Sequence, residues 1–101
     1  MQSLKAEGDK LANDQKWSDA AKKYKRATLI DDGSCARTYG VLWSNLALCY
    51  DKLVVLDKYL EAAKKCVDVD PSFIKGYRRL AKAYRLTYQF EKSMEVIGAK
   101  G

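Results

Sequence analysis

The fold of this chain is decided by residues 43–50, which read Trp43-Ser44-Asn45-Leu46-Ala47-Leu48-Cys49-Tyr50. Apolar side chains recur there at steps of three and four residues, which is the period of one face of an α-helix. The small residue Ala47 lies on that same face. A side chain of this size allows a second helix to approach closely. The stretch therefore predicts a helix that packs tightly against a partner helix.

The same pattern occurs twice more, in an earlier copy that begins at Leu4 and in a later copy that begins at Tyr77. The aligned positions are Leu4/Trp43/Tyr77, Gly8/Ala47/Ala81, Leu11/Tyr50/Tyr84 and Trp17/Leu56/Phe90. At each aligned position the residues are either all large or all small. We therefore predict a 34-residue repeat of two helices, with five residues inserted at 35–39. A single pair cannot bury its apolar face alone, whereas stacked pairs can. We expect Gly8 and Ala81 to lie at close contacts between helices.

Helical periodicity predicts six helices, at about 2–14, 17–30, 36–52, 56–68, 72–87 and 90–100. The Asp-Asp-Gly-Ser run at 31–34 is typical of a turn and ends the second helix. Asp70 and Pro71 are typical of an N-cap and a first helical residue, so they mark the start of the fifth helix. The predicted fold class is all-α, with six antiparallel helices.

Composition restricts the function. The chain has 101 residues and a formal charge of +6, so its surface favours acidic partners such as carboxylate-rich peptides, nucleic acid or anionic membrane. Six glycines and one proline are too few for the many turns of an all-β fold. The absence of histidine excludes Ser-His-Asp and Cys-His catalysts and most zinc sites. We therefore expect no enzyme activity, no cofactor and no metal.

Cysteine usage and hydropathy bear on location. Cys35, Cys49 and Cys66 are an odd number without Cys-x-x-Cys spacing, so a reducing, cytoplasmic location is expected. We expect Cys49 and Cys66 to be small buried residues and Cys35 to be exposed in the insertion. The longest aliphatic run is residues 53–56, and the N-terminus lacks the apolar core of a secretory signal. We expect no insertion into a membrane.

The recurring pattern Trp43-x-x-Leu46-Ala47-x-x-Tyr50, with Asp70-Pro71 closing its repeat, resembles the tetratricopeptide repeat (TPR). The resemblance implies a single domain over residues 1–101, with repeats at 1–34, 40–73 and 74–101 and an insertion at 35–39. It also implies a right-handed superhelical stack in which the first helix of each pair lines a concave, peptide-binding groove.

A subset of TPR domains, those of Hsp70 and Hsp90 co-chaperones, binds the acidic C-terminal peptide of the chaperone through a carboxylate clamp. Lys5 and Asn45 match the clamp residues of the first two repeats, and Lys75 and Arg79 match those of the third. Asp9 stands where the family has a further asparagine. The resemblance thus implies a co-chaperone-type adaptor. With Lys82, which continues the basic stripe, the expected peptide-binding residues are Lys5, Asp9, Asn45, Lys75, Arg79 and Lys82.

The position of Asp9 leaves three interpretations open. Its carboxylate weakens the clamp by repelling the ligand, pairs with Lys5 one turn away, or selects a different ligand. The alternative function is a TPR scaffold with a non-functional or altered clamp, which binds another peptide or self-associates through its uncapped last repeat. Met94 and Ile97 would be partly exposed in that repeat. Binding of nucleic acid is the weaker interpretation of the charge, because the aromatic residues fall on packing positions.

Overall fold

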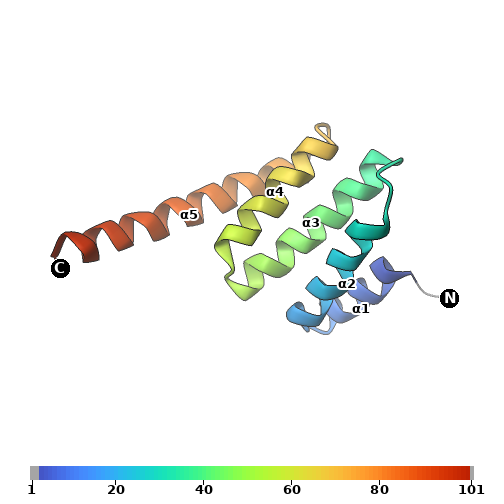
Figure 1. The fold of residues 1–101 in the computed structure, drawn as a ribbon, viewed down its shortest axis with the longest axis horizontal. Coiled ribbons are helices and arrows are strands. Elements are labelled where there is room, and N and C mark those ends of the chain that lie inside the picture. The colour runs from blue at the N-terminus through green and yellow to red at the C-terminus, as the bar shows by residue number, and fades with distance from the viewer. Residues whose placement is uncertain (1–2, 101) are drawn as a thin grey trace.

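The computed structural model describes residues 3–100, with side chains described from 3 to 91. Figure 1 shows the helices in chain order. They are α1 (Leu4–Asn13), α2 (Trp17–Ile30), α3 (Ala36–Leu53), α4 (Leu56–Val69) and α5 (Ile74–Lys100). Residues 3–100 contain no strand, so the all-α class is confirmed. α3 takes up residues 36–39 of the predicted insertion as an additional first turn.

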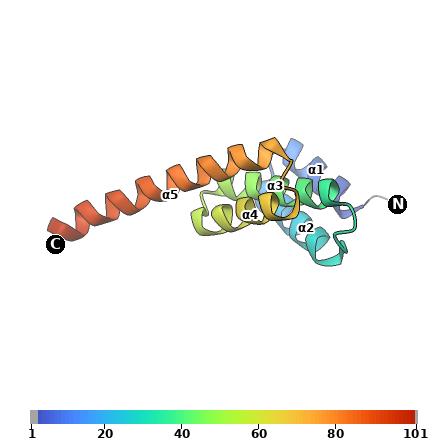
Figure 2. The ribbon, with the colours of Figure 1, turned by 90° about the horizontal axis from the view of Figure 1, so that it is seen from above.

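The helices form two layers. α1, α3 and α5 lie on one side, and α2 and α4 lie on the other, as the view in Figure 2 shows. α1 packs against α2 and α3 packs against α4, which gives two helix pairs in the predicted order. α3 also contacts α2 and α5, so it is the central helix of the domain.

Both helix pairs turn in the same way. Gln15 and Val54 have left-handed backbone conformations, with φ of 61° and 58°. After each of them, a backbone N–H bonds to a carbonyl five residues earlier, from Lys16 to Leu11 at 2.8 Å and from Val55 to Tyr50 at 2.9 Å. This arrangement gives hydrogen-bond partners to carbonyl groups at the end of a helix, which otherwise have none. Gln15 and Val54 are 39 residues apart, which is the same shift that aligns Leu4 with Trp43.

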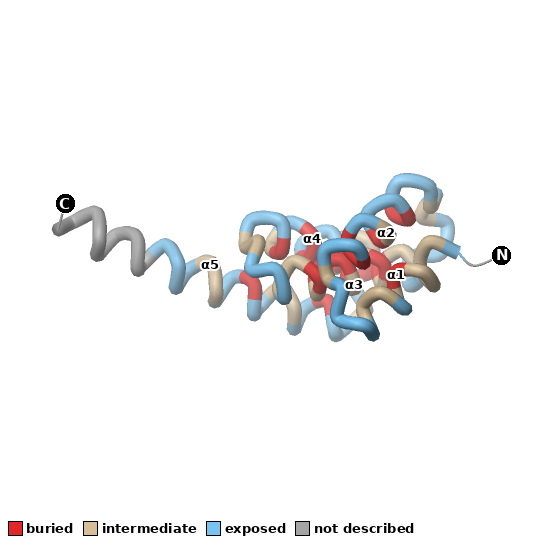
Figure 3. The backbone as a smooth tube through the Cα atoms, turned by 90° about the horizontal axis from the view of Figure 1, so that it is seen from below, coloured by how far each residue is buried: buried red, intermediate tan, exposed pale blue. Residues whose placement is uncertain are grey.

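Close packing within the first pair requires Gly8. A Cβ atom at this position would lie 2.7 Å from the ring of Tyr24 on α2, so the expected close contact is confirmed. Tyr24 is 2% exposed and belongs to the core, which Figure 3 shows where the helices meet. In the second pair Ala47, at the aligned position, is fully buried. Cys49 and Cys66 are buried and Cys35 is exposed, as expected.

The third repeat differs from the expectation. α5 continues from Ile74 to Lys100, so the structure contains five helices over residues 3–100 rather than six. The aligned turn position in this repeat is Tyr88, which lies inside α5. Residues 85–91 contain no glycine, asparagine or proline, and extending a formed helix is much easier than starting a new one. The prediction of a separate sixth helix at 90–100 is therefore wrong for this structure, whereas the superhelical sense of the stack stays a prediction.

The expectation that Ala81 lies at a close helix contact is wrong for this structure. Ala81 is exposed, and over residues 3–100 the structure has no separate second helix in this repeat, since α5 is continuous. Its neighbours Tyr77 and Tyr84 are 47% and 49% exposed. Met94 and Ile97, which the sequence placed at an open end, lie outside the described side chains.

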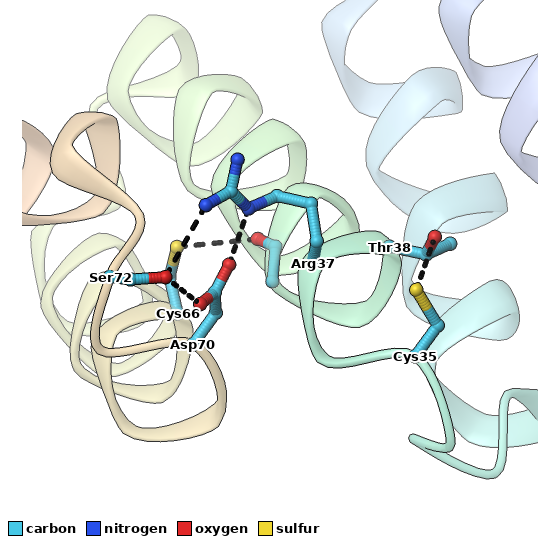
Figure 4. Close-up of polar contacts among 7 residues, drawn as sticks. Cys35, Arg37, Thr38, Cys66, Asp70 and Ser72 are labelled. Carbon is cyan, nitrogen blue, oxygen red and sulfur yellow. Dashed lines mark hydrogen bonds and ion pairs between the residues drawn. The ribbon is translucent and has the colours of Figure 1, made fainter.

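The link between α4 and α5 also differs from its prediction. Asp70 is not the N-cap of α5, which begins four residues later at Ile74. Its side chain instead accepts hydrogen bonds from Arg37 Nε on α3 at 2.5 Å and from Ser72 Oγ at 2.8 Å, as Figure 4 shows. These contacts hold the pKa of the Asp70 carboxyl below its usual value, chiefly through Arg37. Beside them, the thiol of Cys66 donates to the Gly40 carbonyl at 3.2 Å and joins α4 to α3.

Candidate peptide-binding face

The predicted site residues lie on the three helices of one layer. Lys5 and Asp9 are on α1, Asn45 is on α3, and Lys75, Arg79 and Lys82 are on α5. Because α3 lies between α1 and α5, its side chains can bridge the two groups. The contacts described below show which of these residues the fold brings together.

Asp9 is the centre of the first group. Its Oδ2 atom pairs with Lys5 Nζ at 2.8 Å, and its Oδ1 atom accepts a hydrogen bond from Tyr24 OH at 2.5 Å. Asn45 Nδ2 lies 3.5 Å from the same Oδ1 atom. Lys5 and Asn45, which were both predicted to hold a ligand carboxylate, therefore converge on the carboxylate of Asp9. Of the three interpretations of Asp9, pairing with Lys5 is observed.

The surroundings of Asp9 favour its ionised form. Partial burial opposes ionisation, but the hydrogen bonds from Lys5 and Tyr24 outweigh it, so the pKa of the Asp9 carboxyl lies below its usual value. Burial and the bond to Asp9 raise the pKa of the Tyr24 hydroxyl. Asp9 is thus a carboxylate and Tyr24 a neutral hydrogen-bond donor at neutral pH.

Arg79 lies next along the layer. Its Nε atom donates to Ser44 Oγ on α3 at 2.6 Å, and Ser44 is 1% exposed. Ser44 precedes Asn45, so this bond places the Arg79 side chain near the residue that approaches Asp9. Lys75 lies one turn earlier on α5 and is exposed. It forms no side-chain hydrogen bond or ion pair with residues 3–91, so its ammonium group faces solvent.

Lys82 is separated from this group. Its Nζ atom pairs with Asp51 Oδ2 at 2.8 Å, near the C-terminal end of α3. The hydrogen bond to Asp51 raises the pKa of Lys82. Asp51 lies seven residues beyond Ser44, or about 10 Å along the helix. The structure therefore gives Lys82 an internal partner, whereas the sequence placed it in the same basic stripe as Lys75 and Arg79.

Three residues outside the predicted peptide-binding set contact its members. They are Tyr24, Ser44 and Asp51. Tyr24 was assigned to the core because it falls on a packing position, and its hydroxyl adds a polar contact at the edge of that core. Ser44 lies on the helix face that the sequence assigns to the groove, but the sequence does not identify its partner, which is 35 residues away.

The described residues contain no group of three or more His, Cys, Asp or Glu side chains placed to hold a metal ion. Over the same part of the chain, no helix has the length and hydropathy needed to cross a membrane.

Comparison with known proteins supports the resemblance drawn from the repeats. No family model matches the chain. It is 36% identical over 92 residues to an Hsp70-Hsp90 organizing protein of Triticum aestivum, and 36% identical over 88 residues to Hsp70-Hsp90 organizing protein 3 of Arabidopsis thaliana. These matches cover 91% and 87% of the chain but only 15% of either relative. Human sperm-associated antigen 1 is 28% identical over 92 residues, which cover 91% of the chain and 9% of that protein. The repeated helix pairs and these relatives together make the chain a tetratricopeptide-repeat domain that resembles those of co-chaperones.

Proposed function

We propose that this domain is an adaptor module that binds the acidic C-terminal segment of an Hsp70 or Hsp90 chaperone across α1, α3 and α5. The observation that carries the proposal is the convergence of Lys5 and Asn45 on a single carboxylate, that of Asp9. Arg79 is bound to Ser44, the residue before Asn45. A site that gathers donors around an internal carboxylate has the chemistry to hold a ligand's carboxylate. The names of the plant relatives support a chaperone as the partner.

The residues of α5 are the first contacts for such a ligand. The bond from Arg79 Nε to Ser44 fixes the side chain and leaves the two terminal guanidinium nitrogens to form a planar fork on a carboxylate. Lys75 adds a point charge one turn away. Each charge-assisted hydrogen bond contributes about 1.5–3 kcal/mol. Ordering a flexible tail offsets much of that gain, so we expect a dissociation constant in the micromolar range.

Asp9 limits the contacts that a ligand can make with Lys5 and Asn45. Its carboxylate holds Lys5 and lies near Asn45, so a ligand carboxylate has to compete with Asp9 for both donors. The clamp is therefore weaker than one with asparagine at this position. This proposal combines two of the interpretations, since Asp9 pairs with Lys5 and by doing so weakens the clamp.

A second candidate function rests on the open face of α5. Tyr77 and Tyr84 are half exposed, and Phe90 is 56% exposed. Single exposed aromatic side chains are common, but several on one helix are typical of a surface that another protein covers. Self-association through α5 is therefore the alternative. Analytical ultracentrifugation at micromolar concentrations without ligand would reveal it as a dimer.

Calorimetric titration tests the adaptor proposal. The ligands are peptides with an Hsp70-type and an Hsp90-type acidic tail, each with a free and an amidated C-terminus. Binding should require the free carboxylate. Arg79→Ala and Lys75→Ala should each lose most of the affinity, while Arg79→Lys should recover only part of it, because an ammonium group cannot form the planar fork.

The matched control is Lys65→Ala, which removes one exposed positive charge from α4 in the other layer. Its affinity should stay within a factor of two of the parent protein. If Arg79→Ala and Lys75→Ala both bind as the parent does while circular dichroism shows an intact fold, the clamp proposal is wrong.

A further inference from the structure

A furrow runs between α2 and α4, on the side of the domain away from α5. Two hollows of about 190 and 310 Å³ lie along it, and they share Lys25, Tyr50 and Lys58. Lys25 belongs to α2, Lys58 to α4 and Tyr50 to α3, so α3 forms the floor between two outer helices. Figure 1 shows α3 running between α2 and α4. We call this feature the α2–α4 furrow.

The smaller hollow of the furrow is apolar and aromatic. Trp43, Leu46 and Tyr50 line it from α3, and Ala62 lines it from α4. Tyr39 also lines it and packs edge-on against Trp43, with 6.2 Å between ring centroids, which fixes the indole ring. A cavity of about 150 Å³ can hold a benzene molecule. The hollow of about 190 Å³ is therefore large enough for one aromatic or leucine side chain.

One polar atom in this wall lacks a partner. The Nε1 atom of Trp43 is buried and forms no hydrogen bond with the described residues. A buried indole N–H normally has an acceptor. Because this atom is closed off from the surface, it offers no hydrogen bond to a ligand in the hollow, and the proposal does not depend on it.

The mouth of the furrow is positively charged. Lys22, Lys25 and Lys58 line it, while Glu61 is the one acid among its lining residues. None of the three lysines forms an ion pair with an acid among the described side chains. Lys58 Nζ lies 5.8 Å from the centroid of the Tyr50 ring, so one cation is held directly over the aromatic floor. An apolar hollow beside unpaired cations is complementary to a ligand that carries carboxylates on either side of an apolar group.

We propose that the α2–α4 furrow binds a short acidic segment of a partner protein. One aromatic or leucine side chain of that segment enters the hollow over Trp43 and Tyr50. Carboxylates on either side of it pair with Lys25 and Lys58. The furrow shares no residue with the face formed by α1, α3 and α5, so this proposal stands independently of the clamp and allows the domain to hold two acidic partners at once.

The test uses the whole chain and an acetylated, C-terminally amidated nonapeptide of aspartate and glutamate with one central phenylalanine. Amidation removes the terminal carboxylate that the clamp requires. We expect calorimetric binding that Lys58→Glu and Lys25→Glu each weaken at least tenfold. Glu61→Lys should tighten it. In a Trp17→Phe background Trp43 is the sole tryptophan, so its fluorescence should change on binding.

Two controls make the test specific. Lys65→Glu makes the same charge change on an exposed part of α4 that lines neither hollow, and it should weaken binding less than twofold. A peptide with alanine in place of phenylalanine should bind at least tenfold more weakly, because it leaves the hollow empty.

Four results of the peptide titrations would overturn the proposal. They are an absence of binding, equal loss in Lys65→Glu and Lys58→Glu, equal affinity for the alanine peptide, and loss of binding in Arg79→Ala. The last would place the peptide on the clamp face instead. If a single-stranded RNA of equal charge binds more tightly than the peptide and displaces it, that result assigns the furrow to nucleic acid and also refutes the proposal.

Discussion

Replacing Asp9 by asparagine should make the domain less stable and the clamp stronger. The substitution keeps the volume nearly constant and removes one negative charge. It breaks the 2.8 Å ion pair with Lys5 and converts the hydrogen bond from Tyr24 into one between neutral groups. It also leaves Lys5 and Asn45 without a competing carboxylate. Stability and affinity should therefore change in opposite directions.

The structure sets the size of the stability loss. The Lys5 and Asp9 side chains are 38% and 40% exposed, so their pair contributes only about 0.3–0.5 kcal/mol. A hydrogen bond to a charged group is stronger than one between neutral groups by about 1 kcal/mol. The free energy of unfolding should thus fall by about 1–1.5 kcal/mol. For a domain of this size, that lowers the melting temperature by about 4–12 °C.

The stability lost in Asp9→Asn should be large at neutral pH and small in acid. The pKa of Asp9 in the folded protein lies below its usual value of 3.8. Its ionised form therefore adds stability above that pH, and the contribution disappears as the pH falls through the lowered pKa. The parent protein and Asp9→Asn should differ most in stability near neutral pH and should converge in acid.

The gain in affinity comes from lost repulsion. We expect Asp9→Asn to bind a peptide with a free C-terminal carboxylate about tenfold more tightly, which corresponds to about 1.4 kcal/mol. The gain should shrink with an amidated peptide and at high salt. Calorimetric titration measures the affinity, and thermal denaturation followed by circular dichroism measures the stability.

Two matched variants separate charge from packing. Asp14→Asn makes the same charge change at an exposed residue beyond the end of α1, and it should alter neither affinity nor stability by much. Tyr24→Phe removes the hydroxyl but keeps the Asp9 charge, so it should lower stability without tightening binding. Equal or weaker peptide binding by Asp9→Asn would refute the reasoning, because Asp9 would then itself contact the ligand.

Three further predictions follow from the packing. Gly8→Ala should lower the free energy of unfolding by about 1–3 kcal/mol, because its Cβ would lie 2.7 Å from the Tyr24 ring; a more stable variant in urea denaturation, as helix propensity alone predicts, would contradict this. Ala81→Leu should change stability by less than about 0.5 kcal/mol because Ala81 is exposed; a measured cost above about 1 kcal/mol would show that a sixth helix packs there in solution. Arg37→Ala should raise the midpoint pH of acid unfolding. The parent gains stability from ionised Asp70 above pH 3.8 and loses it as the pH falls through the lowered pKa of that carboxyl. Identical acid titrations of the two proteins, followed by circular dichroism, would show that Arg37 does not stabilise the fold through Asp70.

The helix pairs and their register could be predicted from the sequence because they depend on short-range features. Apolar spacing of three and four residues identifies a helix face whatever surrounds it. The alignment that matches Leu4 with Trp43 also matches Gln15 with Val54, and both of these turn residues adopt the same left-handed conformation. Gly8 was recognisable as a contact point because the aligned positions in the other repeats are also small residues, both of them alanine.

The residue types at the candidate site were available from the resemblance, but their partners were not. Asp9 and Tyr24 are 15 residues apart, and Arg79 and Ser44 are 35 apart. Contacts over such separations depend on the distance and angle between packed helices, which periodicity does not specify. For the same reason, Lys82 was grouped with a basic stripe although Asp51 on the neighbouring helix is its partner.

The end of the chain shows where local sequence information becomes insufficient. Residues 74–100 have helical spacing throughout, so the sequence alone allows either one long helix or two helices separated near Tyr88. A break sacrifices backbone hydrogen bonds and is favourable only if the second segment then buries enough apolar surface against the first. That balance is set by tertiary contacts. The structure resolves it with one continuous α5, which leaves Ala81 exposed.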